Sequence, residues 1–409
     1  MKKLFFVELF AGIGGMSQGF ETHGGFEAIA LTDIDLDSRD TYCENFQDKV
    51  YLTKDAQFLA TKQLRNIADG KDICGILGCP PCQGFSPAGK RDSQDERNRR
   101  IKDFLRITKE LRPRFFVFEN VPRVIYSNIF QELIIELDEA GYSIWSGVLN
   151  AALYGLPQTR QRAIAIGIDK TLSVSPTPPP ITHVGCREVF DYANQRFVMP
   201  CSYDGFSIFG FYPDTLRIAT GDVERLLQKN EMELSVLSPI VTVGDALDDL
   251  PEPAWSQNEE PILYKSDCDA VTEYQYKMRC GSDSVHSHSR RKHNLKSIGE
   301  WSKVPVGGKP GFDTKDQRYF SQAYGRLHPR GLSRTITCGF MNPGCGRFLH
   351  YKQSRSITIR EAARLQSLKD NFRFIKSQTI NCRLVGNAFP PLWAEAIAAE
   401  LYRILSDVL

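Results

Sequence analysis

Two cysteines in the segment GCPPCQGFSP, residues 78–87, are the first groups in the chain that could do chemistry. Cys79 and Cys82 are separated by two prolines, and a glycine follows two residues later. A cysteine can act as a nucleophile through its thiolate, pair in a redox disulfide or bind zinc. The prolines stiffen the chain before Cys82 and the glycine frees it afterwards. This segment alone does not choose among the three roles, so the rest of the sequence must.

The redox and zinc alternatives find less support elsewhere in the sequence. The Cys-x-x-Cys spacing matches thioredoxin-like proteins, but there the motif opens a helix, whereas glycine, serine and proline follow here. Zinc would need a second pair of ligands, and neither His286 with His288 nor Cys338 with Cys345 has the spacing of a second half-site. A buried structural cysteine is the commonest alternative. The position after an apolar run, where active-site loops of α/β sheets lie, favours the nucleophile, and we expect no metal site.

Three further segments carry polar residues suited to holding a pyrimidine ring. FVFENVP ends an apolar run with Glu119 and Asn120. YGLPQTRQRAIAIG places Arg160 and Arg162 two residues apart, so on a strand they would share one face. VGNAFPP offers a glycine-asparagine turn. Taken singly, the acid could be an exposed strand end and the arginines a solvated face.

The elements that must position these residues alternate over roughly the first 170 residues. AGIGG after the first apolar run predicts a glycine turn that opens a helix. The alternation predicts a doubly wound, mostly parallel α/β sheet. Strands are expected at 2–10, 27–35, 49–55, 72–81, 112–122, 142–151 and 162–169, and helices at 37–46, 98–112 and 128–141.

The chain changes character at the proline cluster SVSPTPPPITH, which predicts a linker. From about 181 to 350 it is irregular and rich in aromatic and turn residues, with a basic stretch HSHSRRKHN. Regularity returns in a helix that Thr358 and Glu361 would cap at capping-box spacing. CRLVGNAFPP predicts a strand-like turn, and LWAEAIAAELYRIL a last helix. We expect a catalytic domain at 1–180, completed by 376–409, and a small domain at 181–375.

Length, charge and cysteine usage exclude several classes of protein. A chain of 409 residues is too long for one average core. Its net charge of +2 creates no global field toward nucleic acid, so such a partner would need a local basic face. No run approaches the about 18 apolar residues of a membrane span. Eleven scattered cysteines do not form a secreted disulfide framework, and we expect a soluble, cytoplasmic monomer.

Taken together and in order, the motifs resemble those of the DNA (cytosine-5)-methyltransferases of prokaryotic restriction-modification systems. The matching segments are FAGIGG, PPCQGFS, ENV, QTRQR, SITIREAARLQ and GNAFPP. Each is weak alone, but six in this order are specific, and they leave one large variable gap between 168 and 320. The resemblance implies an S-adenosylmethionine-dependent methyltransferase sheet with a smaller, irregular target-recognition domain.

The implied reaction moves a methyl group from S-adenosylmethionine to carbon 5 of a flipped-out cytosine in a specific double-stranded DNA sequence. Carbon 5 is a poor nucleophile, and a covalent Cys82 adduct at carbon 6 would activate it. By resemblance, Glu119 bonds ring nitrogen 3 and the exocyclic amine, and Arg162 binds the carbonyl with Arg160 beside it. Flipping the base out of the duplex costs roughly a few kcal/mol.

The resemblance also implies where S-adenosylmethionine binds. Phe10 matches the position that packs on the adenine, and the backbone of Ala11, Gly12 and Gly14 approaches the ligand. Asp33 stands where the family usually has a glutamate for the ribose hydroxyls, and GNAFP replaces the usual GNAVP. The remaining implied residues are Ile34 on the adenine face, Asp55 on the adenine amine, Ala56 beside it, and Asn387 at the C-terminal end.

The segment that follows Cys82 is polar and rich in arginine, which predicts a loop that closes over DNA. The long variable region favours double-stranded DNA over the main alternative, an RNA cytosine-5 methyltransferase of the tRNA-modifying branch. A catalytically silent DNA-binding regulator is a second alternative. We expect a nucleoid-associated enzyme that works beside a cognate restriction or defence system. The residues expected at the DNA are Gln83, Ser86, Lys90, Arg97 and Arg99.

Overall fold

The computed structural model describes residues 2–81, 99–184, 187–198, 237–256, 261–264, 272–310 and 322–409. The chain divides into two compact units. The first unit comprises Met1–Leu149, Gln161–Pro180 and Phe389–Leu409, and the second comprises Asn150–Arg160 and Ile181–Ala388. The division of catalysis and target recognition between two domains stays a prediction.

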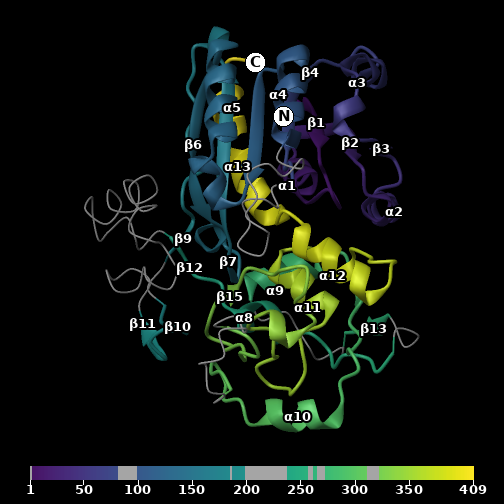
Figure 1. The fold of residues 1–409 in the computed structure, drawn as a ribbon, viewed down its shortest axis with the longest axis vertical. Coiled ribbons are helices and arrows are strands. Elements are labelled where there is room, and N and C mark those ends of the chain that lie inside the picture. The colour runs from purple at the N-terminus through teal and green to yellow at the C-terminus, as the bar shows by residue number, and fades with distance from the viewer. Residues whose placement is uncertain are drawn as a thin grey trace. The chain divides into compact units, whose positions relative to one another are not determined.

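The first unit is built on a seven-stranded sheet with the order β3-β2-β1-β4-β5-β8-β6 (Figure 1). The neighbouring pairs from β3 to β5 are parallel, and β8 runs antiparallel to β5. The predicted doubly wound, mostly parallel sheet is therefore confirmed. Its strands are β1 Leu4–Leu9, β2 Phe26–Asp33, β3 Val50–Thr53, β4 Ile73–Gly78, β5 Phe115–Asn120, β6 Tyr142–Asn150 and β8 Gln161–Asp169.

Helices cover both faces of this sheet because alternate strand residues point to opposite sides. On β5, Phe116 and Phe118 pack with Phe104 of α4 at ring-centroid distances of 6.1 and 5.4 Å. Phe115 instead packs with Phe26 of β2 at 5.7 Å, on the side where α1 and α13 lie together. The helices are α1 Gly15–His23, α2 Leu36–Asn45, α3 Thr61–Ala68, α4 Arg100–Leu111, α5 Asn128–Glu139 and α13 Pro391–Leu405, with short 3-10 turns η1 Ala56–Phe58, η3 Pro122–Tyr126 and η5 Lys170–Leu172.

The second unit has short elements joined by irregular chain, as its composition predicted. In the part of this unit that the structure describes, the strands have two or three residues each, and the longest helix, α12, has ten. None of the helices in the described ranges has the length and apolar character needed to span a bilayer. The elements are η4 Ala151–Tyr154, β7 Gln158–Thr159, β9 His183–Val184, β10 Val189–Asp191, β11 Arg196–Val198, β12 Ser238–Pro239, α8 Val243–Leu247, β13 Ile262–Leu263, α9 Glu273–Arg279, β14 Ser284–Val285, α10 Leu295–Ser302, β15 Ser333–Arg334, η8 Pro343–Cys345, α11 Ile359–Leu365 and α12 Gln378–Asn387.

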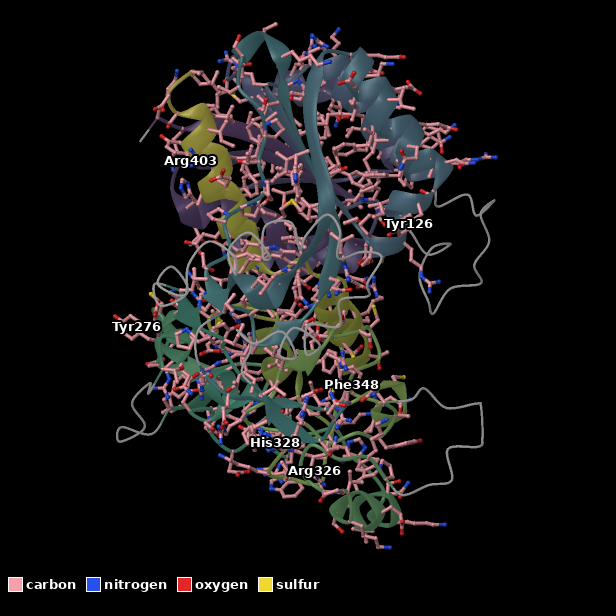
Figure 2. The ribbon with its side chains drawn as sticks, turned by 90° about the vertical axis from the view of Figure 1, so that its left-hand side faces the viewer. Tyr126, Tyr276, Arg326, His328, Phe348 and Arg403 are labelled. Carbon is pink, nitrogen blue, oxygen red and sulfur yellow. The ribbon has the colours of Figure 1, made fainter. Side chains whose placement is uncertain are left out.

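Buried arginines hold this irregular chain together. Arg326, labelled in Figure 2, donates to the carbonyl oxygens of Trp301 at 2.6 Å, Val304 at 2.8 Å and His350 at 2.6 Å. Arg347 donates to three further backbone carbonyls, each at 2.8 Å. Irregular backbone leaves carbonyl groups without ladder partners, and the fixed fork of a guanidinium can satisfy several of them at once.

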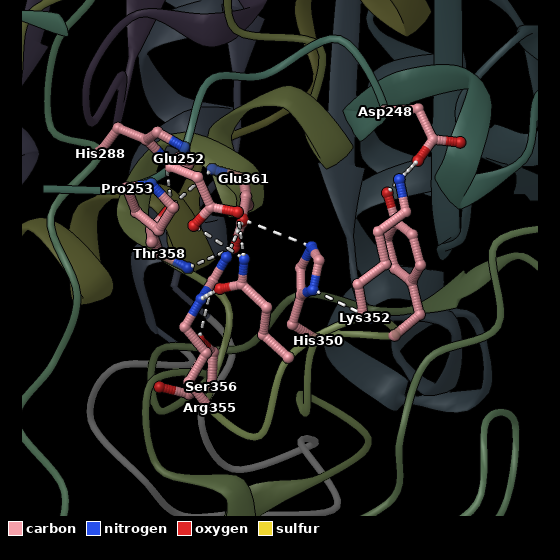
Figure 3. Close-up of polar contacts among 12 residues, drawn as sticks. Asp248, Glu252, Pro253, His288, His350, Lys352, Arg355, Ser356, Thr358 and Glu361 are labelled. Carbon is pink, nitrogen blue, oxygen red and sulfur yellow. Dashed lines mark hydrogen bonds and ion pairs between the residues drawn. The ribbon is translucent and has the colours of Figure 1, made fainter.

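The start of α11 is the centre of a buried polar network (Figure 3). Thr358 and Glu361 form the predicted capping box. Arg355 donates to both carboxylate oxygens of Glu361, at 2.8 and 2.7 Å, and His288 bonds Thr358 at 2.9 Å. Burial alone would raise the pKa of Glu361, but Arg355 together with His350 and His288 outweighs burial and holds that pKa well below its usual range. The helix therefore begins on an ionised, fully paired carboxylate.

One predicted element is wrong. CRLVGNAFPP was expected to form a strand-like turn, but its first half belongs to α12, which ends at Asn387. The Ser377 side chain caps the helix by accepting from the backbone of Ile380 at 3.4 Å. The chain leaves helical geometry at Ala388, directly before Phe389 and two prolines.

Candidate functional site

A strained turn follows β1 in the first unit. Phe10, Gly12 and Gly14 all have left-handed backbone, with φ of 57°, 54° and 71°. A side chain at Gly14 would collide with the ring of Tyr42, whereas a side chain at Gly12 would meet no atom within 4 Å. Packing therefore requires glycine at 14, while the space beside Gly12 is open to a ligand.

Carboxylates stand at the ends of β2 and β3, the two strands on one side of β1. Asp33, at the end of β2, accepts hydrogen bonds from the backbone N–H groups of Gly12 at 2.8 Å and Asp35 at 2.9 Å. Burial raises the pKa of Asp33, and the two N–H donors oppose that rise. Ile34, the next residue, leaves 67% of its surface exposed.

Asp55 follows β3 and forms the N-cap of η1. One of its carboxylate oxygens accepts from the backbone of Gln57 at 2.9 Å and from Arg100 at 2.6 Å. Arg100 is the first residue of α4 and also pairs with Asp103 at 2.9 Å. Ala56 is buried behind Asp55. The sequence-predicted residues of β1, β2 and β3 thus meet at the carboxyl end of the parallel strands, where ligands of open α/β sheets bind.

The chain that leaves β4 is anchored before it reaches Cys82. The backbone N–H of Cys79 donates to Leu9 at 3.4 Å, and the side chain of Asn120 donates to the carbonyl of Pro80 at 3.1 Å. Asn120 is buried at the end of β5. From the sequence, Asn120 was noted only as the residue after Glu119, without a role of its own. Its position beside that acid was the one signal that could have pointed to it.

Glu119 and Arg162 form an ion pair across the antiparallel strands β5 and β8. Arg162 Nε lies 2.8 Å from Glu119 Oε1, and the side chains are only 16% and 10% exposed. Arg162 also donates to the carbonyl of Gln161 at 2.7 Å. Glu119 and Arg162 are 43 residues apart in the sequence. The fold brings them together as a nearly buried pair of carboxylate and guanidinium at the end of β5.

Arg160 lies in a different setting from Arg162. It falls between β7 and β8 rather than on a strand, so the expectation that the two arginines share a strand face is wrong. Its side chain is buried, and its carbonyl accepts from Ala151 at 2.9 Å within the second unit. β7 pairs with β15, whereas β8 pairs with β5. Arg160 lies where the chain turns from β7 into β8, so it belongs to neither strand.

The C-terminal motif contributes to both units. In the second unit, the Cys338 thiol donates to the amide oxygen of Asn387 at 2.9 Å. In the first unit, Phe389 stacks on Trp393 with ring centroids 5.2 Å apart, and its carbonyl lies where a side chain on Gly15 would be. The unusual phenylalanine of GNAFPP therefore packs on the start of α13.

Several expected residues lie outside the described part of the chain: Cys82, Gln83, Ser86, Lys90 and Arg97. Arg99 is described; it is exposed and forms the N-cap of α4. Within the described ranges, no group of three or more His, Cys, Asp or Glu side chains could hold a metal ion.

Two groups beside the turn, one buried and one partly buried, were missed from the sequence. Glu8 on β1 accepts from the backbone N–H of Ser17 at 2.9 Å and from the Ser17 hydroxyl. Burial raises the pKa of Glu8 to about 8. Tyr51 on β3 donates its hydroxyl to the carbonyl of Gly12 at 2.7 Å. An acid inside the apolar run KKLFFVELF was a visible signal for Glu8, whereas nothing local marked Tyr51.

Comparison with known proteins points to one family. The model of the C-5 cytosine-specific DNA methylases matches residues 4–403. The type II methyltransferase M.DdeI of Desulfomicrobium norvegicum is 28% identical over 422 residues, covering 97% of this chain and 88% of the relative. The type II methyltransferase M1.HphI of Haemophilus parahaemolyticus is 28% identical over 411 residues, covering 98% and 87%.

Solved structures agree on the fold. An E. coli prophage protein described as a DNA modification methyltransferase superimposes with a TM-score of 0.71 at 24% identity, covering 98% of this chain and 99% of that one. The Dnmt2 methyltransferase of S. pombe gives a TM-score of 0.57 at 15% identity, covering 99% of each chain. At these identities the likeness shows the fold alone.

Proposed function

The chain belongs to the C-5 cytosine-specific DNA methylase family, and from this premise we propose how its residues carry out the reaction. It is a DNA (cytosine-5)-methyltransferase, and the type II methyltransferases among its relatives support DNA over tRNA as the substrate. The methyl donor of the family is S-adenosylmethionine, which supplies an electrophilic methyl group on sulfur. What remains to be assigned is the role of each side chain.

We propose that S-adenosylmethionine binds at the turn after β1. The open space beside Gly12 fits a ligand that approaches the backbone closely. Asp33 offers a carboxylate to the ribose hydroxyls, and exposed Ile34 offers an apolar face to the adenine. Asp55 keeps one carboxylate oxygen for the adenine amine while Arg100 holds the other. The contributions of Phe10, Ala11, Gly14, Ala56 and Asn387 stay predictions of the resemblance.

Cys82 is the proposed nucleophile. Its thiolate adds to carbon 6 of the flipped cytosine, which turns the ring into an enamine whose carbon 5 can accept the methyl group. Loss of the carbon 5 proton and of the thiolate then restores the aromatic ring. Support comes from the hydrogen bond between Asn120 and Pro80, because it fixes the chain two residues before Cys82.

The ion pair between Glu119 and Arg162 is the observation that carries this proposal. Negative charge at Glu119 favours protonation of ring nitrogen 3 as the thiolate adds, and its second oxygen can accept from the exocyclic amine. Arg162 has five N–H donors, so it can hold Glu119 and still donate to the cytosine carbonyl. Both side chains are more than four-fifths buried, which strengthens their interaction with a base.

The proposed partner is double-stranded DNA. We assign sequence recognition to about 181–350 within the small domain 181–375. Ser86, Lys90, Arg97 and Arg99 are placed near DNA phosphates and Gln83 at the DNA, and Arg160 stays a proposed neighbour of the base. A cognate restriction or defence system, a monomeric state and a cytoplasmic location beside the nucleoid also remain predictions.

Bisulfite sequencing of DNA from cells that express the protein tests this function. The parent should methylate cytosine in one sequence context, Cys82→Ser should methylate none, and Cys79→Ala should keep most activity. Unmethylated DNA with the parent would contradict the proposal, and equal loss in both variants would point to a paired-cysteine role. Methylcytosine in tRNA but none in DNA would favour the RNA alternative.

A further inference from the structure

The peptide groups on both sides of Gly12 are held by side chains from neighbouring strands. The N–H of Gly12 donates to Asp33 at the end of β2, at 2.8 Å, and its carbonyl accepts from the hydroxyl of Tyr51 on β3, at 2.7 Å. The N–H belongs to the peptide plane before Gly12 and the carbonyl to the plane after it. Together the two bonds fix both backbone dihedrals of this residue.

The backbone of Gly12 has little else that would hold it in one conformation. It has no side chain, a left-handed φ of 54°, and no neighbouring atom within 4 Å of where a Cβ would lie. Phe10, two residues earlier, is also left-handed, which is costly for a residue with a side chain. A glycine without packing contacts explores many conformations unless hydrogen bonds select one.

Tyr51 is itself rigidly placed. Its ring packs beside Tyr42 of α2 with centroids 5.3 Å apart, and the Tyr42 ring lies directly against Gly14. Burial, with Asp33 and Glu8 nearby, raises the pKa of Tyr51, so its hydroxyl remains a donor at neutral pH. The two tyrosines thus support the turn at Gly12 and at Gly14.

We propose that Tyr51 is a positioning residue of the cofactor site, whose hydroxyl holds the Gly12 carbonyl so that the turn is formed before S-adenosylmethionine binds. The inference rests on the proposed function of the turn. Losing the hydroxyl leaves the peptide plane after Gly12 free to rotate, and binding must then order it. Glu119 lies on β5, away from this turn, and the substitution leaves the side chains proposed for the chemistry unchanged, so chemistry at saturating cofactor should be unaffected.

Tyr51→Phe tests this with Tyr142→Phe as its matched control. Tyr142 also donates its hydroxyl to a backbone carbonyl, that of Pro113 at 2.7 Å, but from β6 at the opposite edge of the same sheet. By calorimetry, Tyr51→Phe should raise the Kd for S-adenosylmethionine roughly three- to tenfold. The KM for the cofactor should rise alike, with kcat and the KM for DNA unchanged. Tyr142→Phe should lose at least as much thermal stability and bind the cofactor like the parent.

Hydrogen exchange without cofactor gives a second readout. The amides of residues 10–14 should exchange faster in Tyr51→Phe than in the parent or in Tyr142→Phe. Unchanged exchange and affinity in Tyr51→Phe, or an equal loss of affinity in both variants, would overturn the inference while leaving the proposed function intact. A parent protein that does not bind S-adenosylmethionine would overturn the proposed function and this inference with it.

Discussion

Replacing Glu119 by glutamine removes the negative charge from the proposed base-binding pair and keeps its shape. The amide oxygen of Glu119→Gln can still accept from Arg162, so the side chain should stay in place. The amide presents an NH₂ group where one carboxylate oxygen stood, and it cannot favour a proton on ring nitrogen 3. We therefore expect the variant to fold, to bind S-adenosylmethionine and to fail at the chemical step.

The size of the effect follows from the geometry of the pair. At the 2.8 Å that separates Arg162 Nε from Glu119 Oε1, the gross attraction at an effective dielectric of about 20 is about 6 kcal/mol. Most of this attraction offsets the cost of desolvating the two charges, so the net loss of stability should be about 1.5–3 kcal/mol, as for other hydrogen bonds to charged groups. Methyl transfer should fall by about 10²- to 10⁴-fold, the range for a lost proton-transfer partner.

Single-turnover transfer of a labelled methyl group into duplex DNA measures the chemical step, and calorimetry measures cofactor binding. Glu400→Gln is the matched control, because Glu400 is 7% exposed and pairs with Arg403 of α13 at 2.7 Å (Figure 2 labels Arg403). Because Arg403 is 68% exposed, Glu400→Gln should lose less stability than Glu119→Gln and keep full activity. The reasoning is refuted if Glu119→Gln transfers methyl groups at the parent's rate, or if its loss of activity is matched by loss of cofactor binding.

Three further predictions concern the cofactor, acid stability and sequence choice. Asp33→Ala should weaken S-adenosylmethionine binding in calorimetry far more than DNA binding in a gel-shift assay; the reverse pattern would contradict its assignment. Burial lowers the pKa of His288 and of His350 to about 4. The unfolded chain therefore takes up protons first as the pH falls, and stability should decline from about pH 6.5 to about pH 4. Denaturant midpoints across that range should show this decline, and His288→Gln should flatten it. A graft of another member's variable region over 181–350 should redirect methylation to the donor's sequence; continued methylation of this protein's own sites would disprove the recognition assignment.

The sheet was predictable from sequence because its signals are local. Each strand is a short apolar run, and the turn after β1 carries the glycines that its left-handed backbone requires. Glu119 and Arg162 were each found from the motif around them, and the ladder between β5 and β8 brings them together. Glu119 and Arg162 each lie on a strand of the sheet and in the proposed site. The same stretch of sequence therefore predicts both the strand and the site residue.

The remaining features depend on contacts between distant parts of the chain. Tyr51 reaches a carbonyl 39 residues away, and nothing in KVYLTKD marks that hydroxyl as different from any strand tyrosine. The composition of VGNAFPP favours a turn, yet the helix that Ser377 caps at its start continues to Asn387, with Leu384 and Val385 buried in the second unit. Tertiary context overrides local propensity in such segments.

Trapping on fluorinated DNA tests the central claim most directly. Fluorine at carbon 5 cannot leave as a proton does, so after methyl transfer the thiolate cannot be eliminated and the adduct persists. Duplex DNA with 5-fluorocytosine at the target, incubated with the protein and S-adenosylmethionine, should give a covalent complex whose modified peptide maps by mass spectrometry to Cys82. A complex mapped to Cys79, or none on DNA that the protein is shown to methylate, would contradict the account.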